Sequence, residues 1–590
     1  MLRLVVPAAI AMAATLCAQT AILPLKDVKP GMRGIGRTVF DGSKIDDFQV
    51  EILGVLDNVG PKESLILARL SGGPLEHTGV MQGMSGSPVY IDGKLVGAVA
   101  MAFPNAKDPI AGIRPIEAML RNSTAPSATP GSSAPASRPL ALNDRDLTRR
   151  FTRPEPAMSG EARMTDIATP LSFGGFSRAT LEAFAPQLRT LGLEPRQGVT
   201  SGGKVLPAMG NPADLKPGSM ISVQMMSGDL SVGADGTVTH IDGNHVYAFG
   251  HRFLDIGSTA LPFARAEVLT LLASTNTSFK ISTAKEWMGT IYQDRNTAVA
   301  GELGTRPAMV PVSISLSRAG KAIDSYQMQM VDDTLLSPLL LQMAVFSAID
   351  ATERTVGASS IRVTGQIDFQ NAPPLRVNNV YASDNGTPLL ASLSAAVPVA
   401  FVMQGGFDSL RLKQVALNIE SYDEKKQLTI DSITTSRHDA RPGEKLQLRV
   451  IFTGDNGAET VRTLDYPVPI GAEPGPLYFT VADATTTNIA DFRQVLSATA
   501  RTPAQLLSTV NNLHPNTKAY IRVWRADPAF QLEGVDLPDP PASISLVLSG
   551  SPSIAAGVTS TRNAKIGEME LDLGDMSVTG SKTVQVEVKE

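Results

Sequence analysis

The sequence predicts a mainly β protein with several domains, and three observations carry this prediction. The 590 residues are too many for one domain, and about three to four are expected. Gly (50) and Pro (41) are abundant while aromatic residues make up only 5%, which is typical of many short strands joined by turns. Short alternating or β-branched runs recur along the chain, and one Pro/Ser/Ala-rich stretch interrupts them.

Residues 1–18 have the pattern of a secretory signal peptide. One positive charge at Arg3 precedes an apolar run from Leu4 to Leu16, which is short for a membrane-spanning helix. The single cysteine, Cys17, lies in this segment, and Leu16 before it does not fit a lipoprotein signal. The mature chain would contain no cysteine, so a Cys nucleophile or Cys-based zinc site is excluded. We expect an exported protein, periplasmic or secreted.

Six further segments are expected in order. They are a serine-bearing β-rich segment at 19–121, a Pro/Ser/Ala-rich linker at 122–165, a histidine-bearing β-rich segment at 166–310, a β-rich domain with one helix at 311–424, an immunoglobulin-like β-sandwich at 425–480, and a C-terminal α+β or β region at 481–590.

Helical spacing is found at three places, 176–192, 337–354 and 491–513. The second contains the most apolar later run, which we expect to be a buried helix, so the mature chain should have no integral membrane segment.

The net charge of −5 is mild for this length and predicts neither nucleic acid nor an anionic membrane as a partner. The G-x-G in 31–38 lacks the lysine and the following helix of a phosphate-binding loop, so it is interpreted as a turn. Nothing in the sequence indicates a cofactor.

The stretch GVMQGMSGSPVYIDGKLVGAVA (79–100) holds a candidate nucleophile. Gly83 and Gly86 let the chain turn tightly around Ser85, so that the N–H groups of Gly83 and Ser85 could converge on a developing oxyanion. A hairpin with Asp92-Gly93 at its tip comes next. The alternative is an inert glycine-rich turn, and the second hydroxyl, Ser87, lies past the turn.

Among six histidines, His251 in VYAFGHRFLDIG is the best placed general base, because an apolar strand and a glycine deliver it. A structural histidine is the alternative there, and His77 is a competitor for the role of base. His240 and His245 flank a turn, but no carboxylate completes a metal-ligand pattern, so no metal site is expected.

These residues carry a family resemblance. The serine stretch, with PIAGIRPIEAML after it, closely resembles the serine-containing end of the SpoIVB-type sporulation serine peptidases, which are trypsin-like enzymes of the chymotrypsin-fold group. GTVTHIDGNHVYAFGH looks like the segment that presents the catalytic histidine in that family, and GTIYQDRNTAVAGELG (289–304) is similar to the strand pattern after that histidine. The likeness covers about 30–120 and 215–305.

The resemblance implies two trypsin-like β-barrel halves, followed by the β-sandwich modules. Ser85 then matches the nucleophile and His251 the general base, and the amides of Gly83 and Ser85 supply the oxyanion hole. The family places its histidine segment first, so the two halves stand here in permuted order, which need not move the residues in space.

The third triad member is where this sequence departs from the family. The family's aspartate lies shortly before the serine loop, where this chain has only Glu76. Asp294, 43 residues after His251, is the leading replacement, and Asp255 is the alternative. A Ser-His dyad without a carboxylate is the third reading.

The sequence therefore predicts an exported serine endopeptidase that cleaves protein or peptide substrates. The C-terminal β-sandwich modules would dock substrate or an envelope protein partner. The competing hypothesis is a catalytically inactive secreted binding or scaffold protein that retains the peptidase fold.

Overall fold

The computed structural model describes residues 20–590 with several gaps. The residues within this range that it does not describe are 61, 104–105, 107, 122–146, 148–163, 199–207, 353–355, 496–501, 528, 533–534, 539, 551–557 and 562. The expected signal peptide with Cys17, and most of the expected linker at 122–165, lie outside the described residues.

The first of two barrels is formed by strands between Arg33 and Pro115. Its strands pair antiparallel in the closed ring β1-β2-β3-β6-β5-β4, and the short strand β7 (Thr165–Asp166) adds to β5. Alternation places Phe48, Val50 and Ile52 of β2 in its core. The ring strands are β1 (Arg33–Asp41), β2 (Lys44–Gly60), β3 (Glu63–Ser71), β4 (Pro88–Ile91), β5 (Lys94–Ala102) and β6 (Ile110–Pro115). The short helices are η1 (Leu25–Asp27), α1 (Leu75–Thr78) and α2 (Ile116–Arg121).

The second barrel is also a closed ring of six antiparallel strands, in the order β10-β13-β14-β15-β12-β11. The ring strands are β10 (Met220–Gly228), β11 (Ser231–Asp242), β12 (His245–Ala248), β13 (Gly257–Leu272), β14 (Phe279–Arg295) and β15 (Ala298–Leu303). Strands β8 (Thr169–Gly174) and β9 (Leu193–Gln197) extend it beyond β11, and α3 (Arg178–Thr190) packs on β9. The short helix η2 (Pro212–Asp214) comes before β10.

A second group of strands continues the same sheet from β10 through β17. The resulting thirteen-stranded sheet ends at β19, and one hydrophobic core runs through the second barrel and this extension. Its elements are β16 (Met309–Arg318), β17 (Lys321–Val331), α4 (Leu336–Thr352), β18 (Val356–Phe369), β19 (Leu375–Asn385), α5 (Thr387–Met403) and β20 (Leu412–Tyr422).

Helix α5 is a correction, because the sequence predicted one helix in 311–424 and the structure has two. The segment is apolar all round and carries Pro398 inside it, so it has no helical periodicity to detect.

The C-terminal part is a β-sandwich whose two sheets share one core. It draws strands from beyond residue 480, so it is larger than the 425–480 segment expected from the sequence. One sheet contains β21 (Gln427–Thr435), β23 (Lys445–Gly454), β24 (Glu459–Pro467) and β31 (Ser577–Thr579). The other contains β22 (Asp439–Ala440), β25 (Gly475–Ala482), β26 (Lys518–Arg525), β30 (Ala564–Asp572) and β32 (Ser581–Val588).

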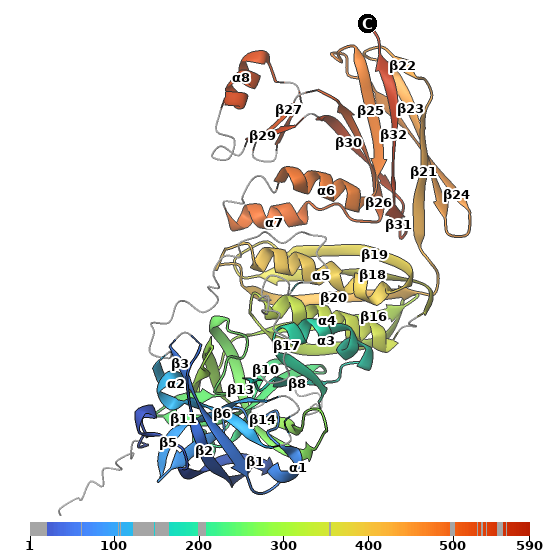
Figure 1. The fold of residues 1–590 in the computed structure, drawn as a ribbon. Helices are drawn as coiled ribbons and strands as arrows, with labels where there is room; N and C mark the ends of the chain where they lie inside the picture. Colours follow the sequence, from blue (N-terminus) through green and yellow to red (C-terminus); the bar gives the residue numbers. More distant parts are fainter. Residues whose placement is uncertain are drawn as a thin grey trace, which may run out of the picture.

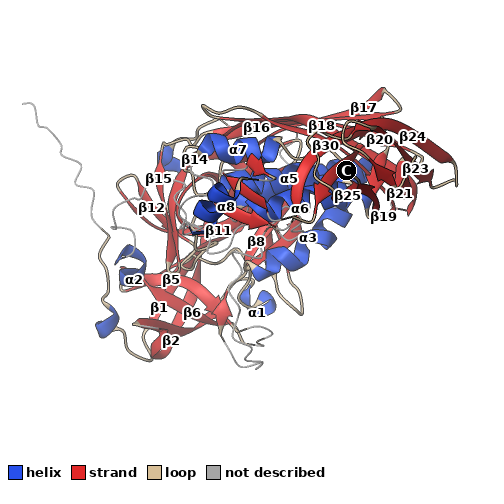
Figure 2. Ribbon diagram, turned by 90° about the horizontal axis from the view of Figure 1, so that it is seen from above, coloured by secondary structure: helices blue, strands red, loops and turns tan. Residues whose placement is uncertain are grey.

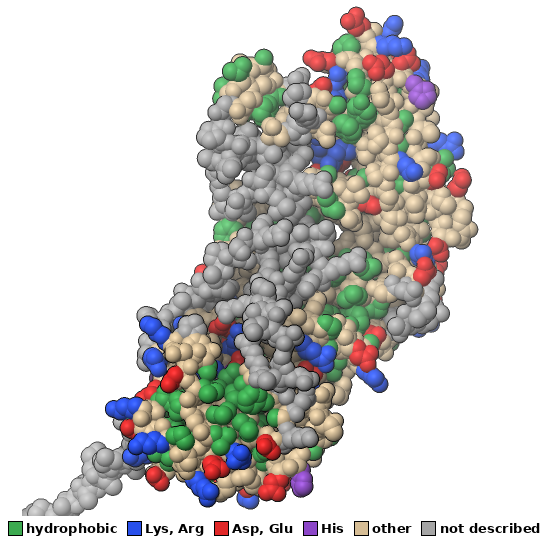
Figure 3. Space-filling view, viewed as in Figure 1, with side chains coloured by type: hydrophobic (Ala, Val, Ile, Leu, Met, Phe, Trp, Pro, Cys, Tyr) green, Lys and Arg blue, Asp and Glu red, His purple; other side chains and the backbone are tan. Residues whose placement is uncertain are grey.

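A small sheet and three helices accompany the sandwich. They are α6 (Ala484–Val495), α7 (Pro503–Asn511), β27 (Ala529–Leu532), β28 (Val535–Leu537), α8 (Ala542–Gly550) and β29 (Val558–Thr561). Hydrophobic side chains gather on the surface of α8, where Leu546 and Val547 are 77% and 68% exposed (Figure 3).

The parts are stacked along a long molecule. The barrels lie together at one end, the α4/α5 layer is next, and the sandwich and the C-terminus lie at the other end (Figure 1). Seen from above, β1, β2, β5 and β6 of the first barrel lie together, with α1 and α2 near its edges (Figure 2). The mainly β class, with barrels and a sandwich, is therefore confirmed. Among the described residues, no helix is both long and apolar enough to cross a bilayer.

Candidate functional site

The segment that carries Ser85, here called the serine loop (residues 82–87), lies between α1 and β4. Gly83 and Gly86 adopt left-handed φ angles of 92° and 91°, which glycine tolerates and other residues rarely adopt. A Cβ on Gly86 would lie 2.0 Å from the Thr237 carbonyl oxygen and 2.6 Å from the Phe249 nitrogen. The sequence motif G-M-S-G therefore lets the serine loop press against the second barrel.

Strand β11 of the second barrel fixes the carbonyl groups of the serine loop. Thr237 donates from its N–H to the Ser85 carbonyl (2.8 Å) and from its hydroxyl to the Gly83 carbonyl (2.9 Å). The Thr239 hydroxyl donates to the Gly86 carbonyl (2.7 Å). These bonds are buried, and together they set the orientation of three peptide units that surround Ser85.

The N–H groups of the serine loop fall into two sets. The first set donates to backbone carbonyls: Gln82 to Ser278, Met84 to Met81, Gly86 to Val99 and Ser87 to Met84. The N–H groups of Gly83 and Ser85 have no hydrogen-bond acceptor within the part of the chain that the structure describes. Unpaired amides this close together are what an oxyanion hole requires, and these are the two amides that the sequence predicts for it.

His251 is delivered by a turn that comes after β12. Phe249 and Gly250 both adopt left-handed φ angles, 67° and 70°, and Phe249 is fully buried. A Cβ on Gly250 would lie 3.1 Å from the Ala98 Cβ of the first barrel, so this turn also packs closely across the two barrels. Since Gly86 abuts the Phe249 nitrogen, the serine loop and the histidine turn are in direct contact.

The imidazole of His251 is held in one tautomer by its own backbone. Its Nδ1 lies 2.6 Å from the Arg252 carbonyl oxygen, which can only accept, so Nδ1 carries the proton. Its Nε2 and the Ser85 Oγ are both buried and have no hydrogen-bond partner among the described residues, so these two atoms are not bonded to each other here. A ring with a proton on Nδ1 leaves Nε2 free to accept one.

Burial lowers the pKa of His251 below its ordinary value. The charge of Asp166 and the bond to the Arg252 carbonyl oppose this shift. A lowered pKa keeps the imidazole neutral near pH 7, which is the protonation state that a general base needs.

Asp294, the leading candidate for the third member, does not pair with His251 in this structure. It is fully buried, and its two oxygens accept the N–H groups of Phe253 (2.8 Å), Leu254 (2.7 Å) and Ile256 (3.3 Å). Burial nevertheless raises the pKa of Asp294 to about 6, with those three bonds opposing the shift. Its carboxylate therefore shapes the loop after the histidine, while the Arg252 carbonyl occupies Nδ1.

The alternative acid, Asp255, lies in that same loop with a left-handed φ of 59°, and its charge contributes to the raised pKa of Asp294. Glu76 and the competing base His77 are exposed on α1. The Ser87 Oγ is buried and, like that of Ser85, has no partner among the described residues.

Asp166 and Arg114 support the histidine turn, and sequence reasoning missed both. Asp166 is held beside β5 by strand β7, and its carboxylate lies 3.9 Å from the guanidinium groups of both Arg114 and Arg252. The buried Arg114 donates to the Gly250 carbonyl (3.3 Å) and to Glu63 (3.1 Å). Arg114 lies within the stretch PIAGIRPIEAML, which by itself assigns this residue no role, and Asp166 lies outside every stretch that carries the resemblance. Strand pairing brings both residues to the site.

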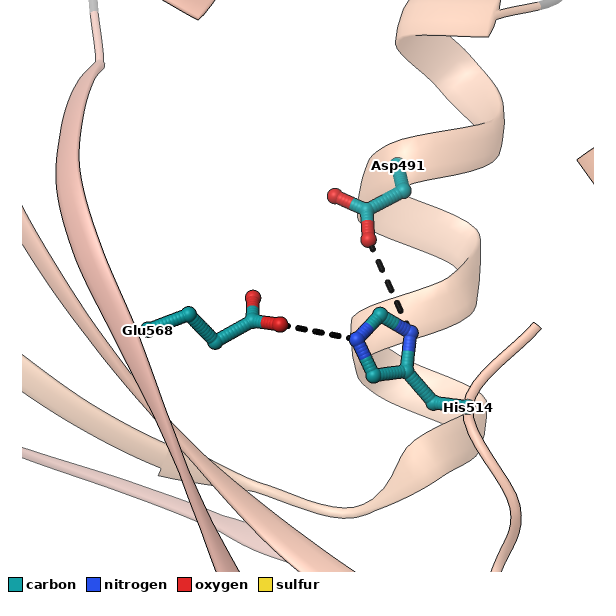
Figure 4. Close-up of side chains that lie close together, drawn as sticks. All are labelled: Asp491, His514 and Glu568. Carbon is teal, nitrogen blue, oxygen red and sulfur yellow. Dashed lines mark hydrogen bonds and ion pairs between the residues drawn. The ribbon is translucent and has the colours of Figure 1, made fainter. Parts of the chain in front are cut away.

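Within the described part of the barrels, no group of histidines and acids has the spacing of a metal site. His240 stacks on Tyr247, and His245 meets Tyr292 edge to face. Among the described residues, the three side chains with suitable spacing are Asp491, His514 and Glu568 in the C-terminal part (Figure 4).

That C-terminal cluster is already satisfied without a metal ion. The Arg522 guanidinium lies 2.8 Å from both Asp491 and Glu568, and Lys565 lies 3.2 Å from Glu568. His514 bonds to Asn488 and Glu568 through its two ring nitrogens. With cations already on both carboxylates, the donor set fits an ion-pair network that ties α6 to β26 and β30.

One comparison with known proteins finds a match, and it lies in the N-terminal part. Residues 11–120 match the family model described as SpoIVB peptidase S55, so the family resemblance of the serine-bearing segment is confirmed. The match ends before the histidine-bearing segment at 166–310. No curated protein and no solved structure matches the chain.

Proposed function

We propose that the protein is an exported serine endopeptidase of the SpoIVB type, with Ser85 as nucleophile and His251 as general base. The observation that carries the proposal is the contact between the serine loop and the histidine turn, where four polar groups have no hydrogen-bond partner among the residues that the structure describes. These groups are Ser85 Oγ, His251 Nε2 and the N–H groups of Gly83 and Ser85. Cleavage of a peptide bond through a tetrahedral intermediate needs one nucleophile, one general base and two N–H donors for the oxyanion.

In the proposed reaction, Ser85 Oγ forms a bond to the carbonyl carbon of a peptide while its proton passes to His251 Nε2. The carbonyl oxygen becomes an oxyanion that accepts the N–H groups of Gly83 and Ser85. His251 then gives the proton to the leaving amine as the C–N bond breaks, and water releases the acyl group by the same sequence of steps.

The third role falls to backbone groups in this proposal. The Arg252 carbonyl holds the Nδ1 proton of His251, and Asp294 positions the loop that carries that carbonyl. A carbonyl stabilises an imidazolium less than a carboxylate does, so we expect a slower enzyme than one with a complete triad.

The burial of the site adds one requirement. Ser85 and His251 are 0% and 1% exposed, so a substrate reaches them only after an opening step. This burial, and the lack of a carboxylate on the ring, favour the second candidate function, a binding or scaffold protein that retains the peptidase fold.

A fluorophosphonate probe separates the two functions. We expect the mature protein to be labelled covalently at Ser85, and the label to disappear in Ser85→Ala and His251→Ala. Ser87→Ala is the matched control, since its hydroxyl is also buried and unpaired, and it should remain labelled. A folded parent that stays unlabelled would support the non-catalytic function.

A further inference from the structure

Lys280 is a buried lysine at the junction of the two barrels that the proposed reaction does not use. It lies on β14 with only 2% of its surface exposed, and burial lowers its pKa to about 7 against the charge of the buried Asp235. Among the described residues no carboxylate forms an ion pair with Lys280. Asp235 acts on it through its charge, and Asp235 Oδ2 accepts the hydroxyls of Ser172 and Ser282. Burial of an amine without an ion pair costs free energy because the amine loses its hydration, so we expect a role of Lys280 in addition to packing.

The Lys280 side chain connects the two barrels. Its Nζ donates to the hydroxyl of Thr38 on β1 of the first barrel (2.7 Å), and Thr38 is fully buried. Strand β1 pairs with β4 at Gly36 and Val89. Because β4 begins directly after the serine loop, β1 runs on past the first residue of β4, which places Thr38 beside that loop.

The stem of Lys280 packs under the serine loop. A Cβ on Gly83 would lie 3.2 Å and 3.3 Å from Cδ and Cγ of Lys280. The Lys280 N–H donates to the Gln82 carbonyl (3.2 Å), and the Gln82 N–H donates to the Ser278 carbonyl (2.9 Å). The lysine thus contacts the loop at the peptide unit that ends in the unpaired Gly83 N–H.

We propose that Lys280 is a positioning residue for the oxyanion hole, which holds the Gly83 end of the serine loop through its bond to Thr38. The inference rests on the proposed function, and it assigns Lys280 no contact with substrate. Thr237 fixes the carbonyls of the serine loop, and the stem of Lys280 packs against the loop at Gly83. The Gly83 and Ser85 amides keep a common direction only while both supports are present.

The test compares Lys280→Met, Thr38→Val and Thr38→Ser in the full chain. Labelling rates over a range of fluorophosphonate concentrations separate the maximal rate from the half-saturating concentration. We expect the maximal rate to fall about 10-fold in Lys280→Met and Thr38→Val with the half-saturating concentration unchanged, because misplaced donors act on the transition state. Thr38→Ser keeps the hydroxyl and should stay within about 2-fold of the parent.

Lys285→Met is the matched control. Lys285 lies on the same strand, is 40% exposed and pairs with Glu267, so its loss should leave the maximal rate unchanged. Thermal unfolding shows whether each variant folds, and if Lys280→Met does not, the Thr38→Val and Thr38→Ser pair carries the test. A folded Lys280→Met with the parent's maximal rate, or equal losses in Thr38→Val and Thr38→Ser, would overturn the inference.

Hydrogen exchange distinguishes failure of this inference from failure of the proposed function. We expect faster amide exchange of the serine loop in Lys280→Met than in Lys285→Met, whether or not the protein is labelled. If the parent is not labelled but the serine loop still exchanges faster in Lys280→Met, the proposed function would be overturned and the support of the loop by Lys280 would be established. Equal exchange of the serine loop in the two variants would overturn the inference that Lys280 supports it.

Discussion

At the scale of the residue, Gly86 links the two halves of the candidate site. Its left-handed φ excludes other residues on conformational grounds, and its close approach to Thr237 and Phe249 excludes them on steric grounds. Gly93, at the tip of the next hairpin, has a φ of 74° but nothing within 4 Å of a Cβ. A comparison of substitutions at Gly86 and Gly93 therefore separates the cost of conformational strain from the cost of a steric clash between the barrels.

We expect Gly86→Ala to destabilise the protein by about 3 kcal/mol or more, because a Cβ forces backbone atoms of both barrels apart. Gly93→Ala should cost only about 1–2 kcal/mol, the penalty for a left-handed alanine. Urea unfolding measures both, and probe labelling should be lost in Gly86→Ala alone. Equal losses of stability would show that the serine loop is not held against the second barrel.

The raised pKa of Asp294 leads us to expect that the stability of the protein depends on pH. Burial raises its pKa from 3.8 to about 6 in the folded protein, so the folded state holds a proton that the unfolded state has released between these values. Stability from this group is therefore full below about pH 4 and falls as the pH rises to about 6, by up to roughly 3 kcal/mol.

Asp294→Asn should remove this part of the fall, as measured by urea unfolding from pH 4 to pH 7. The same change at the exposed Asp214 is the control and should leave the pH profile of the parent. A profile for Asp294→Asn that matches the parent would contradict the assignment of a buried, proton-binding carboxyl.

At the scale of the element, helix α4 buries polar side chains together with apolar ones. From Leu336 to Ile349 every residue is buried, including Gln342, whose side-chain amide has no hydrogen-bond partner among the described residues. Ser347 on the same helix is buried too, but its hydroxyl accepts the Ser177 N–H (2.9 Å). One polar side chain on α4 thus costs stability and another contributes to it.

We expect Gln342→Met to stabilise the protein by about 1–2 kcal/mol, because it removes an unpaired amide at similar volume. Ser347→Ala should act in the opposite direction by about 1 kcal/mol, since it leaves the Ser177 N–H without an acceptor. Thermal unfolding of both variants provides the measurement. Destabilisation by Gln342→Met would indicate that the amide is paired in solution.

At the scale of the whole molecule, Asn516 joins the C-terminal sandwich to the sheet that contains the second barrel. Its side chain accepts the Val380 N–H (2.8 Å) and donates to the Val380 carbonyl (2.6 Å), as a paired strand residue would. Its backbone carbonyl accepts the Val578 N–H of the sandwich (3.0 Å). One residue thus contacts the edge strand β19 and strand β31 at once.

We expect Asn516→Ala to uncouple the sandwich, with a loss of about 1–3 kcal/mol because the Val380 backbone groups lose both partners. Calorimetry should show the sandwich unfolding at a lower temperature and as a more separate transition. Asn512→Ala, which removes only an exposed bond to Ser508, should leave the trace unchanged. A single unshifted transition in both variants would show that Asn516 does not carry the coupling.

Much of the architecture could be predicted from the sequence because it depends on local preference. Glycines at left-handed positions, alternation along strands such as β2 and the apolar strand before Phe249 are properties of short segments. They were enough for the β class, for Ser85 in a tight turn and for His251 at the end of a strand. Helix α5 escaped detection because an all-apolar segment has no periodicity.

Only the tertiary structure decided what surrounds Ser85 and His251. Chain separation favoured Asp294 as the partner of His251, yet the Asp294 oxygens are taken by backbone amides and the Arg252 carbonyl holds the ring. Asp166 and Lys280 reach the site through strand pairing and contact between the barrels, which no spacing encodes. A hydrogen-bond partner is chosen by packing among residues far apart in the chain, whereas a turn is chosen by its own few residues.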